Sequence, residues 1–499
     1  MNSSDKLKAM GDIDPKFVES AGNMKRRALP RLLIAAGAAA AAIGVFFAVR
    51  GVMKANVPEV QAVVTDAPSQ VSTEAPAESA SPGSAEGRQA RLKSAASVTA
   101  YLPEVPKSIL NSDYYEYMHE LLAYANKASQ SLEAFYRRSG AELLKSSEPG
   151  KNALYSPFNV YMALAMLAET ASGNTRAQIL DTLGAASIAE LRDQANTLWL
   201  TNYQDNDAVV SVPAASVWLN SPYCPSVDRN VLERLGTLYH VSVFEGDMAD
   251  PEYSALYRDW LNEQTHDLLS DQVEGKQFDP ADLMTMASTL YYRTRWEYEF
   301  DKDRSEEGLF HSPDGDEQAV FMHGGANLYY ERDGYTAVCK HLKDGSRAWF
   351  ILPDEGVSLD ELVIDGDWWD MVMELPEEGL VGGAIIHLTL PRVDTEAETD
   401  ITEALKRMGV TDAFDPDAAD FSGLTGEPGV YVSRANHGVR VKMDEEGIEA
   451  ASYVELFFAG AAEPTREVDF VLDRPFIFVI QSACGMTPLF AGTVYHTGA

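Results

Sequence analysis

The residues from Ile448 to Ala461 are the part of the sequence whose types and spacing indicate chemistry, here cleavage of the chain itself. The segment contains no proline, and the next proline after it is Pro464. Every second residue from Ile448 onward is mostly apolar and the intervening residues are more polar, as in a half-buried strand. The segment ends in small residues that suit cleavage. It therefore has the composition of a loop and the pattern of a strand, which indicates a chain with two states.

The sequence contains no complete motif for catalysis or metal binding. It lacks a Gly-x-Ser-x-Gly elbow, a phosphate-binding loop and a Cys-x-x-Cys pair, and its 3 cysteines are too scattered for a disulfide framework. His119-Glu120 has no second histidine at the spacing of a zinc hydrolase. The Asp-x-Asp sequences at Asp314 and Asp415 lack the glycine and glutamate of a calcium loop. We therefore predict no enzymatic activity, no cofactor and no metal.

Composition and charge restrict the possible partners. The 499 residues are 45% hydrophobic, so the chain can bury a large core, and the net charge is −36. Such an excess of negative charge argues against nucleic acid or an anionic membrane surface as a partner. We expect a monomer that binds no nucleic acid.

The N-terminal region has the pattern of a membrane anchor. Residues 1–31 are polar and end in a basic cluster, and an apolar run covers residues 32–49. At about 1.5 Å per residue this run is roughly 27 Å long, close to the thickness of a bilayer core. The basic cluster predicts a cytoplasmic tail at 1–31, a transmembrane signal-anchor at 32–49 and a domain outside the cytoplasm. A secreted protein with a cleaved signal peptide is the alternative, although no small-x-small site follows directly.

Beyond the anchor, the composition divides the chain once more. Residues 50–107 are rich in Pro, Ser, Ala and Glu, which predicts a flexible extracytoplasmic linker. Residues 108–499 form the globular domain, with helical patterns first and strand patterns later, as in an α+β domain. The predicted helices are Tyr114–Arg138, Val160–Ala168 and Thr175–Leu183. The predicted strands are Ser211–Leu219, Thr285–Tyr292, Ala348–Leu352, Gly383–Leu390, Gly429–Ser433, Val439–Met443 and Phe470–Ile480.

Short sequences throughout the domain resemble the serpin family, and they occur in the order that the family has. Each is weak alone, but together they are specific. The domain is therefore identified as similar to serpins, of the prokaryotic type with an N-terminal membrane anchor. The matching sequences are Asn152–Val160, Ala163–Leu167, Gly173–Leu180, Thr289–Trp296, Phe350–Asp354, Leu390–Arg392, Ala435–His437, Arg474–Phe478 and Pro488–Gly492.

The resemblance implies a fold and a mechanism. The fold is α+β, with three β-sheets, about eight or nine helices and an exposed reactive-centre loop. In inhibitory serpins a serine protease cleaves this loop and forms an acyl-enzyme. The freed segment then inserts into the large sheet as a new strand and distorts the attached protease. The alternation from Ile448 onward supports this expectation independently.

The family pattern also locates the reactive bond and the hinge of the loop. Counting fourteen residues from the hinge Gly447, or back from Pro475, gives Ala461 in both cases, so the bond is Ala461–Ala462. An alanine at this point suits an elastase-like or subtilisin-like protease. Cleavage after Phe457 or Phe458 by a chymotrypsin-like protease, or after Arg466 by a trypsin-like one, is the alternative. The hinge residues are Glu446, Gly447, Ile448, Glu449, Ala450, Ala451 and Ser452.

Four further residues match the region where the large sheet of serpins opens: Ser156, Asn159, Trp296 and His437. We expect His437 to hydrogen-bond between strands, and Trp296 to pack under the upper end of the sheet. Asn159 stands where serine is usual, and Ser288 where asparagine is frequent.

The resemblance implies a suicide-substrate inhibitor of serine endopeptidases. Ile448 occupies a hinge position where threonine is usual, and its bulk would slow insertion. A non-inhibitory serpin-like binding or structural protein, a protease substrate, or an inhibitor of cysteine proteases therefore remain alternatives.

Overall fold

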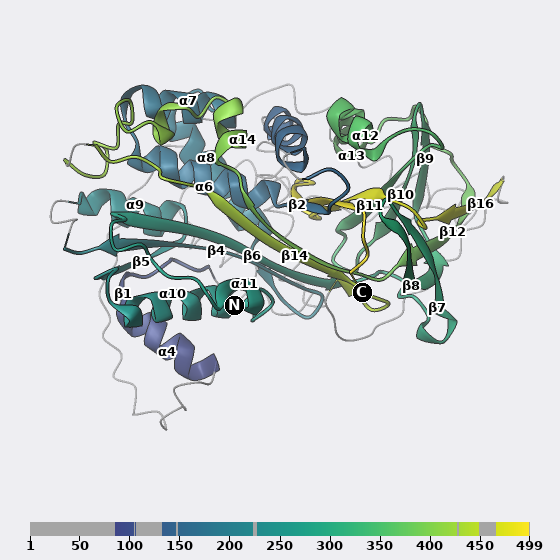
Figure 1. Ribbon diagram of the computed structural model, residues 1–499, viewed down its shortest axis with the longest axis horizontal. Helices are drawn as coiled ribbons and strands as arrows, with labels where there is room; N and C mark the ends of the chain where they lie inside the picture. Colours follow the sequence, from purple (N-terminus) through teal and green to yellow (C-terminus); the bar gives the residue numbers. More distant parts are fainter. Residues whose placement is uncertain are drawn as a thin grey trace, which may run out of the picture. The chain divides into compact units, whose positions relative to one another are not determined.

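Two long antiparallel strands, β4 (Val209–Asn220) and β6 (Met284–Arg295), form the centre of the largest sheet (Figure 1). The computed structural model describes residues 85–103, 105, 132–145, 148–222, 227–426, 429–448 and 466–498. All of them belong to one of the two compact units into which the chain divides. The sheet has the order β1-β5-β4-β6-β15, and β3 pairs with β4. Its other strands are β1 (Ala96–Val98), β3 (Gln204–Asp205), β5 (Val241–Gly246) and β15 (Gly447–Ile448).

Strand β14 (Asn436–Met443) lies along β6 without pairing with it, and pairs instead with β13 (Val393–Asp400). The chain turns after β14 into β15, which is hydrogen-bonded to the end of β6. The large sheet therefore ends in β15 at the end of β6, and along the rest of their length the described strands β6 and β14 are not joined by ladder hydrogen bonds. Because of this division, the described strands form four hydrogen-bonded groups where three sheets were expected.

Two further sheets complete the strand framework. One has six strands and supplies much of the core, because three of its central strands are almost fully buried. Its strands, in sheet order, are β2 (Ala153–Tyr155), β18 (Pro488–Val494), β17 (Phe476–Gln481), β11 (Arg347–Pro353), β10 (Tyr335–His341) and β9 (Leu328–Arg332). The other contains β16 (Arg466–Val471), β12 (Ala384–Pro391), β8 (Gly315–Gly325) and β7 (Glu306–Ser312).

Helices cover both faces of the large sheet, α6 on one face and α10 on the other (Figure 1). Helix α6 begins where Ser156 caps its N-terminus and Pro157 takes the first turn, positions that favour these residue types. The α-helices with complete bounds are α4 (Ala85–Ala95), α6 (Pro157–Thr170), α7 (Gly173–Leu183), α8 (Ile188–Asn202), α9 (Arg229–Leu238), α10 (Pro251–Gln264), α11 (Ser270–Val273), α12 (Leu359–Asp365), α13 (Asp367–Glu374) and α14 (Thr402–Arg407). Residues 132–144 are also helical.

The described helices thus exceed the expected eight or nine. One of them, α11, is a single short turn, and another, α4, lies before residue 108, where the domain was expected to begin. Residues 50–107 were expected to form a linker, but Ala85–Val98 form α4 and β1. Leu92 of α4 is buried in a cluster with Trp218 and Trp260, and β1 pairs antiparallel with β5. A single apolar side chain among charged residues gave little signal of this packing.

The element predictions hold where an apolar pattern coincides with a pairing partner. Segment Gly429–Ser433, predicted as a strand, is irregular, so that prediction is wrong. Segment Phe470–Ile480 is two strands, β16 and β17, separated around Pro475, which cannot donate a ladder hydrogen bond. No helix among the described residues is long and apolar enough to span a membrane, and residues 32–49 lie outside them.

Candidate functional site

The turn between β14 and β15 closes one end of the divided sheet, which we call its upper end; the end at the start of β14 is its lower end. The Asp444 N–H donates to the carbonyl of Gly447 (3.1 Å), and Asp444 Oδ1 accepts the N–H groups of Glu446 (3.0 Å) and Gly447 (3.3 Å). Gly447 pairs with Arg295 of β6, and a Cβ on Gly447 would lie 2.5 Å from Arg295 Cα. Only glycine permits this approach, so Gly447 can start a strand against β6.

Glu445 fastens this turn to the body of the protein. Its carboxylate accepts hydrogen bonds from Arg392 Nη2 (2.6 Å) and Nε (3.0 Å) and from the Ser305 hydroxyl (2.7 Å). Burial opposes ionisation of Glu445, but the Arg392 guanidinium and Ser305 outweigh it and hold the pKa of this carboxyl below its ordinary value. The next residue, Glu446, forms an ion pair with Lys302. The hinge therefore starts from a fixed point.

Trp296 lies under the turn and binds it through two hydrogen bonds. Its backbone N–H donates to the Glu446 carbonyl (3.1 Å), and its indole Nε1 donates to the Asp444 carbonyl (2.8 Å). The Lys340 ammonium lies 5.6 Å from the Trp296 ring and 4.4 Å from the Phe300 ring. Burial lowers the pKa of Lys340 to about 8, so the ammonium stays largely protonated at neutral pH and contributes a cation–π contact. Trp296 is fully buried.

His437, at the lower end of β14, holds this strand against the start of α6. Its Nε2 accepts the backbone N–H of Ser156 (2.9 Å), while the Ser156 hydroxyl donates to the Leu489 carbonyl (2.7 Å). The partner of His437 is therefore the N-cap residue of a helix, and not a residue of another strand as predicted. Burial lowers the pKa of His437 to about 4, which keeps the ring neutral and Nε2 free to accept.

Asn159 and Ser288 connect the same helix to β6. The Ser288 hydroxyl donates to Asn159 Oδ1 (3.3 Å). In the sequence these two residues each depart from the family pattern, one amide where serine is usual and one hydroxyl where asparagine is frequent. The structure places them in contact, so the two residues that depart from the family pattern are hydrogen-bond partners of each other. The start of α6 thus binds both strands, β14 through His437 and β6 through Ser288.

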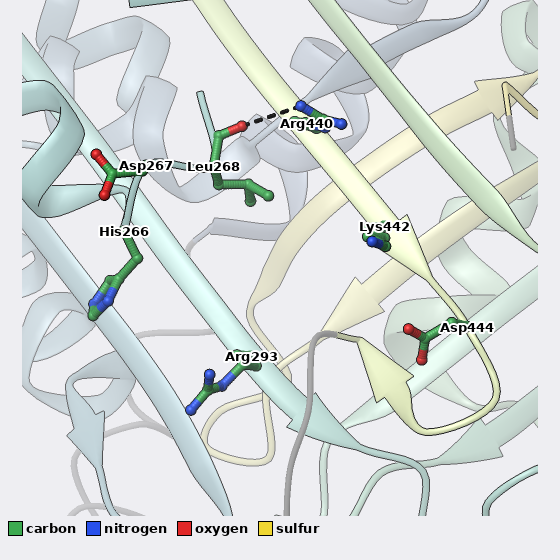
Figure 2. A pocket seen from close by; sticks show the side chains of 7 residues that line it. All are labelled: His266, Asp267, Leu268, Arg293, Arg440, Lys442 and Asp444. Atoms are coloured by element: carbon green, nitrogen blue, oxygen red, sulfur yellow. Dashed lines mark hydrogen bonds between the residues drawn. The ribbon is translucent and has the colours of Figure 1, made fainter. Parts of the chain in front are cut away.

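A cleft lies between β6 and β14, next to the turn (Figure 2). Its volume is about 490 Å³, and a second cavity of about 40 Å³, which shares Leu268 and Arg440 with it, is lined by Asn159 and Ser288 among others. The segment that follows α10 covers this cleft: the His266 ring stacks on Tyr291 of β6 at 4.1 Å, and Arg440 Nη1 donates to the Leu268 carbonyl (3.5 Å). The residues that line the cleft are His266, Asp267, Leu268, Arg293, Arg440, Lys442 and Asp444.

The covering segment has a strained backbone. His266 and Asp267 have φ angles of 50° and 61°, in the left-handed region that side chains with a Cβ rarely occupy. Such backbone conformations cost free energy and persist where surrounding contacts impose them. The contacts here are the His266 stacking and an ion pair from Asp267 to Arg88 of α4 (2.8 Å).

The arrangement can accept one more strand. Within the described residues no ladder hydrogen bond joins β6 to β14 below β15, so the facing edges of both strands are available to a strand between them. The chain that would enter starts at Ile448, which is buried and pairs with Thr294 of β6. At about 3.3 Å per residue, fourteen residues would give a strand of roughly 45 Å.

The structure brings the predicted sheet residues together at this site. Trp296 lies at the upper end of the cleft, and Ser156, Asn159 and His437 lie at its lower end. The reactive bond and most of the hinge lie outside the described residues: Glu449, Ala450, Ala451, Ser452, Ala461 and Ala462. Sequence reasoning missed Arg392, Arg293 and Lys442. Arg392 ends one of the family-like sequences, and a register count from Gly447 would have found the other two.

Comparison with known proteins agrees with this architecture. A sequence model of the family described as "Serpin (serine protease inhibitor)" matches residues 136–497. The chain is 27% identical over 354 residues to the plasma serine protease inhibitor of Bos taurus, which covers 68% of this chain and 83% of the relative. It is 24% identical to an uncharacterized serpin-like protein of Methanosarcina acetivorans, covering 69% and 81% of the two chains, so its relatives include prokaryotic proteins.

Solved structures show the same fold. The native state of tengpin, a thermophilic serpin, superposes with a TM-score of 0.62 at 24% identity, covering 80% of this chain and 97% of tengpin. The predicted fold class is confirmed by this likeness and by the family match.

Proposed function

Because this chain belongs to the serpin family, we propose that it inhibits serine endopeptidases as a suicide substrate. The protease cleaves a bond in the loop that follows Ile448 and forms an acyl-enzyme with it. The protease is trapped when the cleaved segment enters the cleft between β6 and β14. One observation carries the proposal: Gly447 and Ile448 are paired with β6 at the upper end of this cleft. Insertion would extend a strand whose first two residues are in place.

The surroundings of the cleft support insertion in three ways. Glu445 and Trp296 fix the start of the strand, so the cleaved segment pivots about a defined point. The contacts of His437 and Ser288 with α6 hold β14 and β6 at the lower end without a direct ladder between them. Ile448, whose bulk was expected to slow insertion, is buried and paired with Thr294 of β6 in this structure, so its side chain is accommodated at that position.

We place the reactive bond at Ala461–Ala462 and the targets among elastase-like or subtilisin-like proteases. The support is the distance from Gly447 along the sequence and the small side chain of Ala461, which fits a shallow specificity pocket. We further propose that residues 32–49 anchor the protein in the cell membrane with this domain outside the cytoplasm. The support for that is the apolar run and the basic cluster that precedes it.

Denaturing electrophoresis of the domain mixed with pancreatic elastase tests the inhibitory mechanism. We expect a covalent band at the summed mass of the two proteins, and N-terminal sequencing of the released fragment should begin at Ala462. Ala450→Arg should abolish this band while leaving cleavage intact, because a buried arginine opposes insertion but not recognition of residue 461.

Clean cleavage of the wild-type chain, with no covalent band and no rise in melting temperature of the cleaved form, would contradict the proposal. It would leave a serpin-like protein that serves as a binding protein or a protease substrate.

A further inference from the structure

Two cations face the cleft without an ionic partner among the described residues. Arg293 projects from β6 and Lys442 from β14, on either side of the cleft (Figure 2). No described carboxylate lies within 4.0 Å of either, whereas Arg440 is paired with Asp394 (2.9 Å). In a chain with a net charge of −36, two such cations on facing strands are conspicuous.

The carboxylates near these cations are engaged elsewhere. Asp267 accepts two hydrogen bonds from Arg88 (2.8 and 2.9 Å), and Asp444 Oδ1 accepts the N–H groups of the turn. The third cation that lines the cleft, Arg440, also lies 3.8 Å from Glu396. Arg293 and Lys442 are therefore the cations that an incoming negative charge would meet.

The strand register identifies the group that would meet them. Gly447 pairs with Arg295 and Ile448 with Thr294, so an antiparallel continuation of this ladder on insertion would bring the next residue, Glu449, opposite Arg293. The turn that joins Asp444 to Gly447 sets the other side, where the same continuation would bring Glu449 opposite Lys442. Residues directly opposite in antiparallel strands project on the same face with Cβ atoms about 5 Å apart. Insertion would thus bring one carboxylate between two cations.

We propose that Arg293 and Lys442 receive the Glu449 carboxylate and thereby fix the register in which the cleaved segment enters the sheet. This inference rests on the proposed function. The pairing acts at the first inserted residue beyond the existing β15, so it favours the correct register before the longer apolar part of the segment has entered. A slip of one residue would place Ala450 between the cations and expose the apolar face of the segment.

A second glutamate of the segment provides the comparison. In an inserted strand Glu455 would project on the same face as Glu449, because the two positions differ by six residues. The same register would bring Glu455 opposite Ala287 of β6 and Asn436 of β14, which carry no charge. The register therefore distinguishes two acidic residues that composition alone treats as equivalent.

A charge-reversal series tests the pairing. The variants are Glu449→Lys, the control Glu455→Lys, the pair Arg293→Glu with Lys442→Glu, and the combination of that pair with Glu449→Lys. For each we would measure the stoichiometry of inhibition of elastase and the rise in melting temperature of the chain after its loop is cut. Melting of each intact variant confirms that it is folded.

Slower insertion gives deacylation more time, so Glu449→Lys should raise the stoichiometry of inhibition about three- to tenfold, and the Arg293 and Lys442 pair should do the same. The control Glu455→Lys should change it by less than about twofold, and the combined variant should return to within about twofold of the wild type. Added salt should raise the stoichiometry of the wild type but not that of Glu449→Gln, because screening acts only on a charged pair.

Equal effects of Glu449→Lys and Glu455→Lys, or no recovery in the combined variant, would overturn the pairing. If the wild type still trapped elastase in that case, the proposed function would stand without it. If the cut wild type gained no thermal stability, insertion itself would be absent and both proposals would fail.

Discussion

Arg392 and Glu445 form an ion pair in which two guanidinium nitrogens bind one buried carboxylate, at 2.6 and 3.0 Å. The side chain of Glu445 is 3% exposed and that of Arg392 is 39% exposed. Arg392 immediately precedes β13, and Glu445 lies in the turn that leads to the hinge. The pair therefore fixes the upper end of the divided sheet to a strand beyond β14.

Loss of Arg392 should destabilise the protein more than loss of an exposed ion pair. Arg392→Ala leaves the Glu445 carboxylate buried without its counter-ion, and we expect a cost of about 2–3 kcal/mol in the free energy of unfolding. Adding Glu445→Gln should recover part of it, because no buried charge then remains. Urea denaturation measures both. The control is Arg137→Ala, whose pair with Asp370 is about half exposed and should contribute under about 1 kcal/mol.

Gly447→Ala should weaken the pairing of β15 with β6. The added methyl group would overlap Arg295 Cα and the Thr294 carbonyl, which are backbone atoms that cannot turn aside. We expect a loss of about 1–3 kcal/mol in the free energy of unfolding. Gly275→Ala, where no atom lies within 4 Å of the new Cβ, should have little effect. Equal melting temperatures of the two variants would show that the close approach at Gly447 is not required.

His437 should make stability depend on pH. Its pKa is lowered to about 4 in the folded protein from an ordinary value of 6.5, so its contribution is complete above about pH 6.5 and is lost as the pH falls toward 4. Because the protonated ring can no longer accept the Ser156 N–H, we expect a loss of roughly 2–3 kcal/mol at pH 4.5.

The comparison with His437→Gln isolates this effect from the titration of the many carboxylates. The amide oxygen of glutamine can accept the same hydrogen bond, so the variant should lose less free energy of unfolding between pH 7 and pH 4.5 than the wild type. Parallel losses in the two proteins would exclude His437 as the titrating group.

The segment before the globular domain should contribute to stability. Leu92 of α4 is buried beside Trp260 of α10, and Leu92→Ala should cost about 2–3 kcal/mol in the free energy of unfolding, as for other buried leucines at the edge of a core. Leu102→Ala, at a position that is 56% exposed, serves as the control and should stay within about 0.5 kcal/mol. Equal effects of the two substitutions on the melting temperature would show that the contact of α4 with α10 does not stabilise the protein.

The main elements could be predicted where an apolar pattern was long enough to be read locally. Strands β4 and β6 were predicted nearly to their ends, and so were α6 and α7. Gly429–Ser433 failed because alternation alone does not supply a neighbouring strand: the Val432 N–H donates to Ala413, a residue outside any strand. Helix α4 failed for the opposite reason, since its one buried leucine receives its partners from α10.

The site divides in the same way. Gly447, Trp296, Ser156 and His437 could be located because their neighbours along the chain form sequences similar to those of a family. The partner of His437 could not, because the contact joins β14 to the start of α6 across 281 residues. Arg293 and Lys442 carry no local signal either. Their significance appears only when two strand registers, one on each side of the cleft, are counted from the same turn.

Strand β1 has a consequence for how copies of this protein meet one another. It occupies the outer side of β5, which would otherwise end the large sheet with a row of unpaired backbone groups. A molecule cleaved after residue 98 would expose these unpaired groups as an edge strand, to which an extended segment of another chain can hydrogen-bond. Proteolysis in this region would therefore convert a self-contained protein into one prone to fibre growth.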